Sequence, residues 1–236
     1  ANIPIQSRFF VEFGVGDYRE SNTRFLLINN NWSGLVLDAS TKNIESIQED
    51  EIYWRHDIKA RQAFVTAENI NDFLSEANVT GRIGLLHIDI DGNDYWIWQA
   101  ISAVDPAIVI VEYNSVFGND RAITVPYRPD FNRTKAHFSN LFFGASLPAL
   151  HDLCVERGYS FLGCNSAGNN AYFVKEEMAK DLPTTTLSDG YVESKFRESR
   201  DRHNTLTFLS GNHRRDAISG AGLVVWNTRS ERFEPL

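Results

Sequence analysis

The most distinctive polar residues of this 236-residue chain alternate along one predicted strand. Residues 83–90 are apolar enough for a buried strand, and His87, Asp89 and Asp91 occupy every second position at its end. Because side chains alternate between the two faces of a strand, these three are expected on one face. A buried polar row is costly unless its members are paired or bind a ligand. The pattern predicts a functional site here, with Asp89 and Asp91 as catalytic candidates.

A second pair of polar residues, Glu112 and Asn114, closes the predicted strand 107–113. Neighbouring strands lie about 5 Å apart, so Asp89 is expected to converge with this pair. Two carboxylates and an amide oxygen suit Mg²⁺ or Ca²⁺, and such an ion lowers the pKa of a bound hydroxyl. The pattern predicts a metal site at Asp89, Glu112 and Asn114. A hydrogen-bonded cluster without metal fits the same residues and stays an open alternative.

A glycine turn, Glu12-Phe-Gly14-Val-Gly16, follows the first predicted strand, 8–13. Glycines allow a tight turn and the close approach of a ligand to the backbone, next to the amide groups of the following helix. A dinucleotide fingerprint would place a third glycine at position 19, where this chain has Arg19. The turn predicts a nucleotide cofactor without choosing which one.

Asp38 closes the next predicted strand, 34–37, about 20 residues after the glycines. An acidic side chain at this place can accept hydrogen bonds from both ribose hydroxyls of a nucleoside. Asp38 is therefore a predicted cofactor-binding residue.

Alternating strands and helices predict an open, mostly parallel α/β sheet. A third, weaker strand is expected at 63–66, and Ser21 is expected to cap a helix at 21–30. Later elements are predicted at the following places: a helix from Ser146, a hairpin at 159–164 and 170–174, and a strand at 223–226. We expect one domain over 1–180 containing a substrate loop at 115–147, and a C-terminal appendage at 181–236 that contributes to substrate binding.

Net charge, apolar runs and cysteine content limit the binding partners and the compartment that can be expected for this chain. The formal net charge of −8 argues against nucleic acid and anionic membrane as partners. No apolar run approaches the roughly 20 residues of a membrane span, and the first ten residues do not resemble a secretory signal. Two cysteines form no disulfide framework. A cytoplasmic protein is the default expectation, and nothing predicts an oligomeric state.

Four motifs together resemble the FkbM-type methyltransferases, a class I S-adenosylmethionine-dependent family that often modifies sugars. They are Glu12-Phe-Gly-Val-Gly16, Ile88-Asp89-Ile-Asp91-Gly92, Val111-Glu112 and Gly168-Asn-Asn-Ala-Tyr-Phe-Val174, and they span roughly residues 9–174. The resemblance implies a Rossmann-like methyltransferase fold, with a mostly parallel seven-stranded sheet, one antiparallel strand and helices on both faces. It further implies that Glu12, Gly14, Gly16, Asp38 and Asp89 bind the cofactor, with Ala67 and Glu68 beside its adenine.

The segments Asp89-Ile-Asp91-Gly-Asn-Asp-Tyr95 and Asn114-Ser115 are also similar to cation-dependent catechol and caffeoyl-CoA O-methyltransferases. That similarity implies that Asp89 and Asn114 are metal ligands. Two positions depart from it: Gly92 stands where that family has its catalytic lysine, and Glu112-Tyr113 replaces its second aspartate.

Histidines supply the candidates for a general base. His137 is favoured because it lies in the expected substrate loop, and His87 and His151 are the alternatives. Arginines recur in Phe196–His203 and at Arg214-Arg215, where they predict either a salt-bridged surface or a site for an anionic substrate.

Together these features predict an S-adenosylmethionine-dependent O-methyltransferase that acts on a hydroxyl of a sugar or another small molecule. The expected cofactors are S-adenosylmethionine and, if the metal site forms, Mg²⁺ or another divalent cation. Two alternatives remain: an NAD(P)-dependent oxidoreductase, disfavoured by Arg19, and a non-catalytic binding module with a methyltransferase fold.

Overall fold

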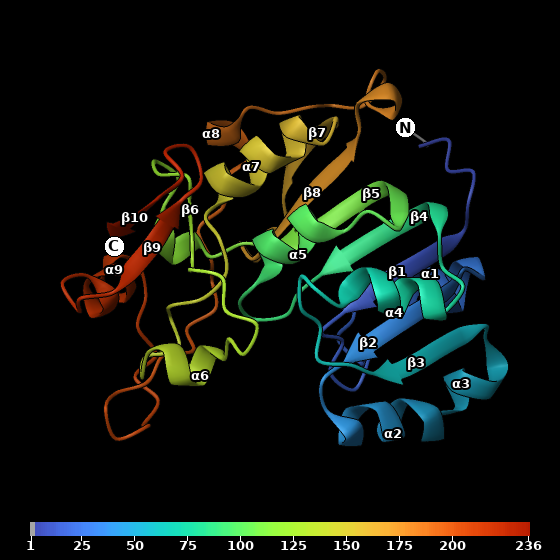
Figure 1. The fold of residues 1–236 in the computed structure, drawn as a ribbon, viewed down its shortest axis with the longest axis horizontal. Helices are drawn as coiled ribbons and strands as arrows, with labels where there is room; N and C mark the ends of the chain where they lie inside the picture. Colours follow the sequence, from blue (N-terminus) through green and yellow to red (C-terminus); the bar gives the residue numbers. More distant parts are fainter. Residues whose placement is uncertain (1–2) are drawn as a thin grey trace. The chain divides into compact units, whose positions relative to one another are not determined.

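The computed structural model of the chain describes residues 3–236. Seven strands form one sheet in the order β3-β2-β1-β4-β5-β8-β7 (Figure 1). Their bounds are β1 (Phe9–Phe13), β2 (Ser33–Asp38), β3 (Ile58–Gln62), β4 (Gly81–Ile88), β5 (Val104–Glu112), β7 (Tyr159–Cys164) and β8 (Asn170–Lys175). β1 pairs in parallel with β2 and β4, β2 pairs in parallel with β3, and β7 and β8 are antiparallel. The predicted mostly parallel, seven-stranded α/β sheet is confirmed, in the strand order of a Rossmann-like methyltransferase fold.

Contacts divide the chain into two compact units, which we call unit 1 and unit 2. Unit 1 contains residues 3–90 and 97–110, and unit 2 contains residues 91–96 and 111–236. The predicted division at residue 180 stays a prediction. Among the described residues, no helix combines the length and the apolar character that a membrane crossing requires.

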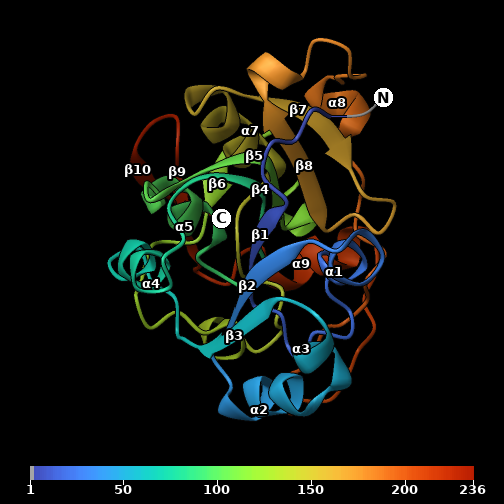
Figure 2. The ribbon, with the colours of Figure 1, turned by 90° about the vertical axis from the view of Figure 1, so that its right-hand side faces the viewer.

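Unit 1 surrounds the parallel strands with short helices. The helices whose residues lie wholly or partly in unit 1 are α1 (Arg24–Asn30), α2 (Thr41–Glu49), α3 (Glu51–Arg55), α4 (Ile70–Glu76) and α5 (Asp94–Ala100). Figure 2 shows α1 and α4 on opposite sides of β1 and β2. The helix α2 begins at Ser40, whose side chain accepts a hydrogen bond from the Asn43 backbone N–H. Its apolar residues Ile44 and Ile47 are buried, as expected for one face of an amphipathic helix.

Unit 2 contains the β7–β8 hairpin and a small second sheet, ordered β10-β9-β6. The remaining elements are β6 (Ile123–Thr124), α6 (Arg133–Ala136), α7 (Leu147–Glu156), α8 (Leu187–Gly190), α9 (Asn212–Ile218), β9 (Val224–Asn227), β10 (Arg232–Pro235) and the 3-10 turns η1 (Ser115–Phe117) and η2 (Glu176–Met178). A buried cluster including Phe117, Phe142 and Val225 joins the second sheet to the 115–147 segment. The predicted hairpin, the helix capped by Ser146 and the late strand are confirmed.

Two sequence predictions in unit 1 were wrong. The third strand lies at Ile58–Gln62, not at 63–66, because Ile58 and Ala60 point inward while Lys59 and Arg61 remain exposed at the sheet edge. The first helix begins after Thr23, and no side chain caps it. Ser21 does not cap the helix α1, because its hydroxyl instead donates a hydrogen bond to the buried Glu12 carboxylate.

Candidate functional site

The glycine turn lies in unit 1 where the strand order reverses between β1 and β4. Gly14 has φ +73°, and a Cβ added there would lie 1.6 Å from the backbone oxygen of Asp89. Its N–H donates to the Leu37 carbonyl at 2.9 Å. Gly16 also has a left-handed φ of +55°, but no atom lies within 4 Å of its would-be Cβ. Gly14 is therefore required by packing, whereas Gly16 leaves open space over the turn.

Asp38 ties the end of β2 to this glycine turn. One carboxylate oxygen accepts the Gly16 N–H at 2.8 Å. The other accepts the Ser40 N–H at 2.8 Å and the Asn43 side-chain amide at 3.0 Å. The side chain is 9% exposed. The two predicted cofactor-binding features, Gly16 and Asp38, are thus in direct contact.

Glu12 is a buried acceptor that organises the chain after the turn. Its carboxylate accepts hydrogen bonds from Ser21 Oγ at 2.5 Å, from the backbone N–H groups of Asn22 and Thr23 at 3.1 and 3.2 Å, and from the Thr23 hydroxyl. His87 Nδ1 lies 2.7 Å from the same carboxylate. Glu12 therefore shapes the loop between β1 and α1, and its assignment to the cofactor stays a prediction.

The electrostatics of Glu12 follow from these contacts. Burial by itself would raise its pKa, but the hydrogen bond and the charge of His87, together with the Ser21 and Thr23 hydroxyls, hold the pKa below its usual value. A carboxylate only accepts, so His87 Nδ1 carries the shared proton. His87 Nε2 lies 3.2 Å from the Asn22 amide, which leaves this ring held in place on both sides.

The predicted row His87, Asp89 and Asp91 does not share one strand face, because β4 ends at Ile88. His87 is 3% exposed and pairs with Glu12, its direct neighbour in the register of β1 and β4. Asp91 has φ +57°, and its side chain is 59% exposed. Asp91 belongs to unit 2, where its carboxylate meets Arg133 at 2.6 Å. One buried pair and one exposed ion pair thus account for His87 and Asp91, while the catalytic and cofactor roles predicted for this row stay predictions.

The expected adenine contacts lie in the turn before α4. Ala67 is half-buried and Glu68 is exposed. Their assignment to the cofactor stays a prediction, as does that of Asp89.

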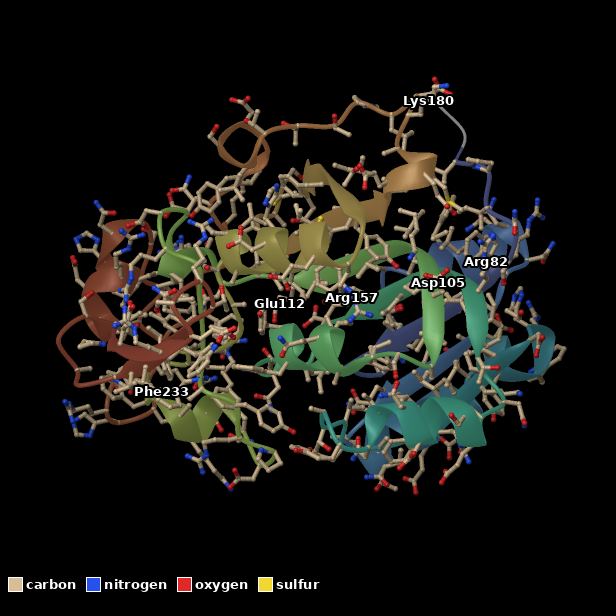
Figure 3. All side chains as sticks on the ribbon, turned by 45° about the horizontal axis from the view of Figure 1, so that its top comes forward. Arg82, Asp105, Glu112, Arg157, Lys180 and Phe233 are labelled. Atoms are coloured by element: carbon tan, nitrogen blue, oxygen red, sulfur yellow. The ribbon has the colours of Figure 1, made fainter. Side chains whose placement is uncertain are left out.

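A cavity of about 220 Å³ lies within unit 2, at the end of β5. Its polar lining includes Glu112, labelled in Figure 3, together with Glu198, Arg133 and Arg214. Its apolar and amide lining includes Tyr113, Asn114, Leu141, Phe143, Asn169 and Phe196. Glu112 is 9% exposed. We call this space the acceptor cavity, after the role that we propose for it below.

Two arginines, Arg133 and Arg214, form part of the wall of this cavity. The Arg133 guanidinium lies 4.0 Å from the centre of the Phe143 ring, and its Nε donates to the Asn140 carbonyl at 2.7 Å. Arg214 is 4% exposed and donates to Glu193 at 2.9 Å and to the Phe196 carbonyl at 3.1 Å. The arginine-rich tail gave a sequence signal for Arg214. Arg133 stands outside that tail, and no sequence pattern pointed to it.

Asn114 follows the end of the strand β5 and has a structural role there. Its Oδ1 accepts the Val116 N–H at 3.0 Å, and its amide donates to the carbonyls of Leu141 and Phe143 at 2.9 and 3.0 Å. Among residues 3–236, no group of three or more histidine, cysteine, aspartate or glutamate side chains is arranged to hold a metal ion. A divalent cation at Asp89, Glu112 and Asn114 stays a prediction that the donor set around Asn114 does not support.

This role of Asn114 gives a testable prediction. Asn114→Ala is expected to lower the free energy of unfolding by about 2–3 kcal/mol, because buried partners lose their hydrogen bonds. The loss is expected to be equal in Mg²⁺ and in EDTA when it is measured by urea unfolding. A wild-type protein stabilised by Mg²⁺, with no such stabilisation in Asn114→Ala, would instead make Asn114 a metal ligand.

His137 lies outside the group of side chains that line the acceptor cavity. Its Nδ1 is 2.8 Å from the Ser139 hydroxyl, and its ring stacks on Phe138 with 4.2 Å between centroids. Burial, with a further contribution from the Arg202 guanidinium, lowers the pKa of His137 below its usual value. A role for His137 as the base stays a prediction.

No protein-family model matches the sequence, and no curated protein matches it. Solved structures similar to the chain include the N-terminal domain of EvdMO1 in the presence of SAH and D-fucose, which is 13% identical, with 70% of this chain and 73% of that chain covered and a TM-score of 0.43. Another is M. capricolum TrmK in complex with SAH, which is 10% identical, with 72% and 62% covered and a TM-score of 0.42. A third is an S-adenosylmethionine-dependent methyltransferase from Clostridium acetobutylicum, 8% identical, with 71% and 83% covered and a TM-score of 0.43. Similarity at this level carries no inference about ligand or reaction, and the fold follows from the strand order itself.

Proposed function

We propose that this protein is an S-adenosylmethionine-dependent O-methyltransferase. The observation that carries the proposal is the contact between Asp38 and the Gly16 N–H beside the point where the strand order reverses. In open α/β sheets, ligands bind outside the carboxyl ends of the strands at such a point. Both residues belong to unit 1, and the open space over Gly16 leaves room for a ligand. Arg19, in place of a third glycine, favours this cofactor over a dinucleotide.

The residues of unit 1 fit a nucleoside with an amino-acid tail. Asp38 Oδ1 already accepts two hydrogen bonds and Oδ2 accepts one, so Oδ2 would accept a ribose hydroxyl, and the backbone at Gly14 and Gly16 would face the rest of the cofactor. Ala67 and Glu68 would flank the adenine. S-adenosylmethionine, when bound, would supply an electrophilic methyl group. The protein contributes mainly by positioning the acceptor hydroxyl for direct displacement.

We assign the acceptor to the cavity in unit 2, and its polar groups support a sugar or saccharide. Carboxylates and guanidinium groups hydrogen-bond to neighbouring hydroxyls, while aromatic faces cover the apolar side of such a ring. The two acids of the lining, Glu112 and Glu198, are balanced by the two arginines, Arg133 and Arg214, which favours a neutral acceptor over an anionic one. Glu112 would accept the proton of the hydroxyl as it is methylated. Glu112 thereby joins the catalytic candidates predicted from the sequence, Asp89, Asp91 and His137.

Calorimetry with S-adenosylhomocysteine and with NADH tests the cofactor. The wild-type protein is expected to bind S-adenosylhomocysteine and not NADH. Asp38→Ala is expected to weaken that binding by about 100-fold, because a charged hydrogen bond to the ribose and the contact that holds the Gly16 N–H are both lost. Asp57→Ala, an exposed aspartate of the same unit, is the matched control and should bind as the wild type does.

Two outcomes would contradict the proposal. Folded wild-type protein that gives no heat with S-adenosylhomocysteine would rule out the cofactor, and binding of NADH instead would support the oxidoreductase. The acceptor class is tested separately by measuring S-adenosylhomocysteine production with a panel of neutral and acidic saccharides. Turnover with acidic sugars alone would contradict the assignment of a neutral acceptor.

A further inference from the structure

A second cavity, of about 300 Å³, lies within unit 2 and shares no lining residue with the acceptor cavity. Its apolar lining consists of Pro126, Phe131, Ala136, Phe142 and Val224. Phe142 is 6% exposed and belongs to the buried cluster of this unit, and Phe131 and Ala136 pack against that cluster. The apolar lining of this cavity is therefore continuous with the buried core of unit 2.

The charged groups of this cavity are mostly cationic. Arg128, Asp130 and Lys135 line it. Arg128 forms an ion pair with Asp130, with 3.2 Å between Nη2 and Oδ2, and both side chains are largely exposed. Lys135 is exposed, and within residues 3–236 its ammonium group forms no ion pair, although its charge helps Arg128 to lower the pKa of Asp130. The lining therefore carries one excess positive charge in a chain whose net charge is −8.

The two cavities use alternate residues of the same segments. Leu141 and Phe143 line the acceptor cavity, whereas Phe142 between them lines the second one. In α6, Arg133 faces the acceptor cavity and Lys135 the second cavity. The two linings therefore draw on neighbouring residues of the same two segments. A change at Lys135 alters one lining without removing a side chain from the other.

We propose that the second cavity binds a ligand with an apolar ring body and one anionic group. Pockets for small molecules are typically apolar, with few polar groups that fix orientation, and this lining has that composition. The ring would pack on Phe131 and Phe142, and the anion would pair with Lys135 at the rim. The proposal is independent of methyl transfer, because neither cofactor nor acceptor takes part in it.

The probe for this site is 1-naphthyl phosphate, titrated into isotope-labelled full-length protein and followed by NMR. We expect saturable shifts of the backbone amides of Phe131, Lys135 and Val224. 1-Naphthoate is expected to bind the same site, whereas 1-naphthol, without the charge, and inorganic phosphate, without the ring, should each bind more weakly by about tenfold or more. If naphthyl phosphate binds and naphthoate does not, the anion is a phosphate and not a carboxylate.

A charge reversal tests the role of Lys135. Lys135→Glu is expected to weaken the binding of 1-naphthyl phosphate by about tenfold or more, because the charge at residue 135 then repels the phosphate instead of attracting it. Lys180→Glu makes the same change at an exposed lysine outside the lining (Figure 3) and should stay within about twofold of the wild type. Absence of saturable shifts, or equal affinity of Lys135→Glu and the wild type, would overturn the proposal.

Discussion

Gly14→Ala is expected to lower the free energy of unfolding by at least about 3 kcal/mol, whereas Gly16→Ala should cost only about 1 kcal/mol. Both glycines have left-handed φ angles, so both substitutions strain the backbone. The two positions differ in the room that they offer to an added methyl group. At Gly14 a methyl group would lie 1.6 Å from the Asp89 carbonyl oxygen, so β1 and β4 must separate, while at Gly16 nothing lies within 4 Å.

Urea unfolding of the two variants under the same conditions gives the comparison. Each variant serves as a control for the other, because both replace a glycine of positive φ in the same turn. Equal destabilisation of the two variants would mean that the close approach of Gly14 to Asp89 does not exist in solution. Gly16→Ala offers a second readout, since a stable variant with weakened S-adenosylhomocysteine binding would place the ligand over Gly16.

The sequence was sufficient for features that depend on local pattern. Apolar runs located four of the five strands from β1 to β5, and the cap at Ser146 and the β7–β8 hairpin followed from local residue types. The strand β3 was missed because its inward residues, Ile58 and Ala60, are few and its outward ones are charged. An edge strand with one covered face has a weak apolar signal.

Features that depend on distant contacts could not be predicted in the same way. The alternation of His87, Asp89 and Asp91 gave no sign that β4 ends at Ile88 or that Arg133 pairs with Asp91. Asn114 has the right atoms for a metal, and only the positions of its backbone partners reveal its structural role.

The partner of His87 could have been inferred with one further step. Glu12 is an acidic residue inside an apolar strand, and β1 and β4 are adjacent in sheets of this topology. Two polar residues buried in adjacent strands are expected to pair, because each alone would be costly. The parallel register does place Glu12 beside His87.

The buried pair of Glu12 and His87 leads to a prediction of a large change in stability. Glu12→Ala is expected to lower the free energy of unfolding by about 3–5 kcal/mol, because it removes the acceptor of a buried network and leaves His87 and the Ser21 to Thr23 segment without it. Glu45→Ala, an exposed glutamate on α2, is the matched control and should change the stability by less than about 0.5 kcal/mol. A loss as small as that of the control would mean that the Glu12 network contributes little to the folded state.

The pH dependence separates the charge of Glu12 from its packing. The pKa of Glu12 in the folded protein lies below its ordinary value of 4.5. A carboxyl with a lowered folded pKa stabilises the protein fully above its unfolded pKa and loses that contribution as the pH falls toward the folded pKa. The stability advantage of the wild type over Glu12→Gln should therefore shrink as the pH falls below 4.5. Urea unfolding from about pH 7 to pH 3 measures this difference. If it stays constant over the whole range, the ionised carboxylate contributes nothing and only the shape of the side chain matters.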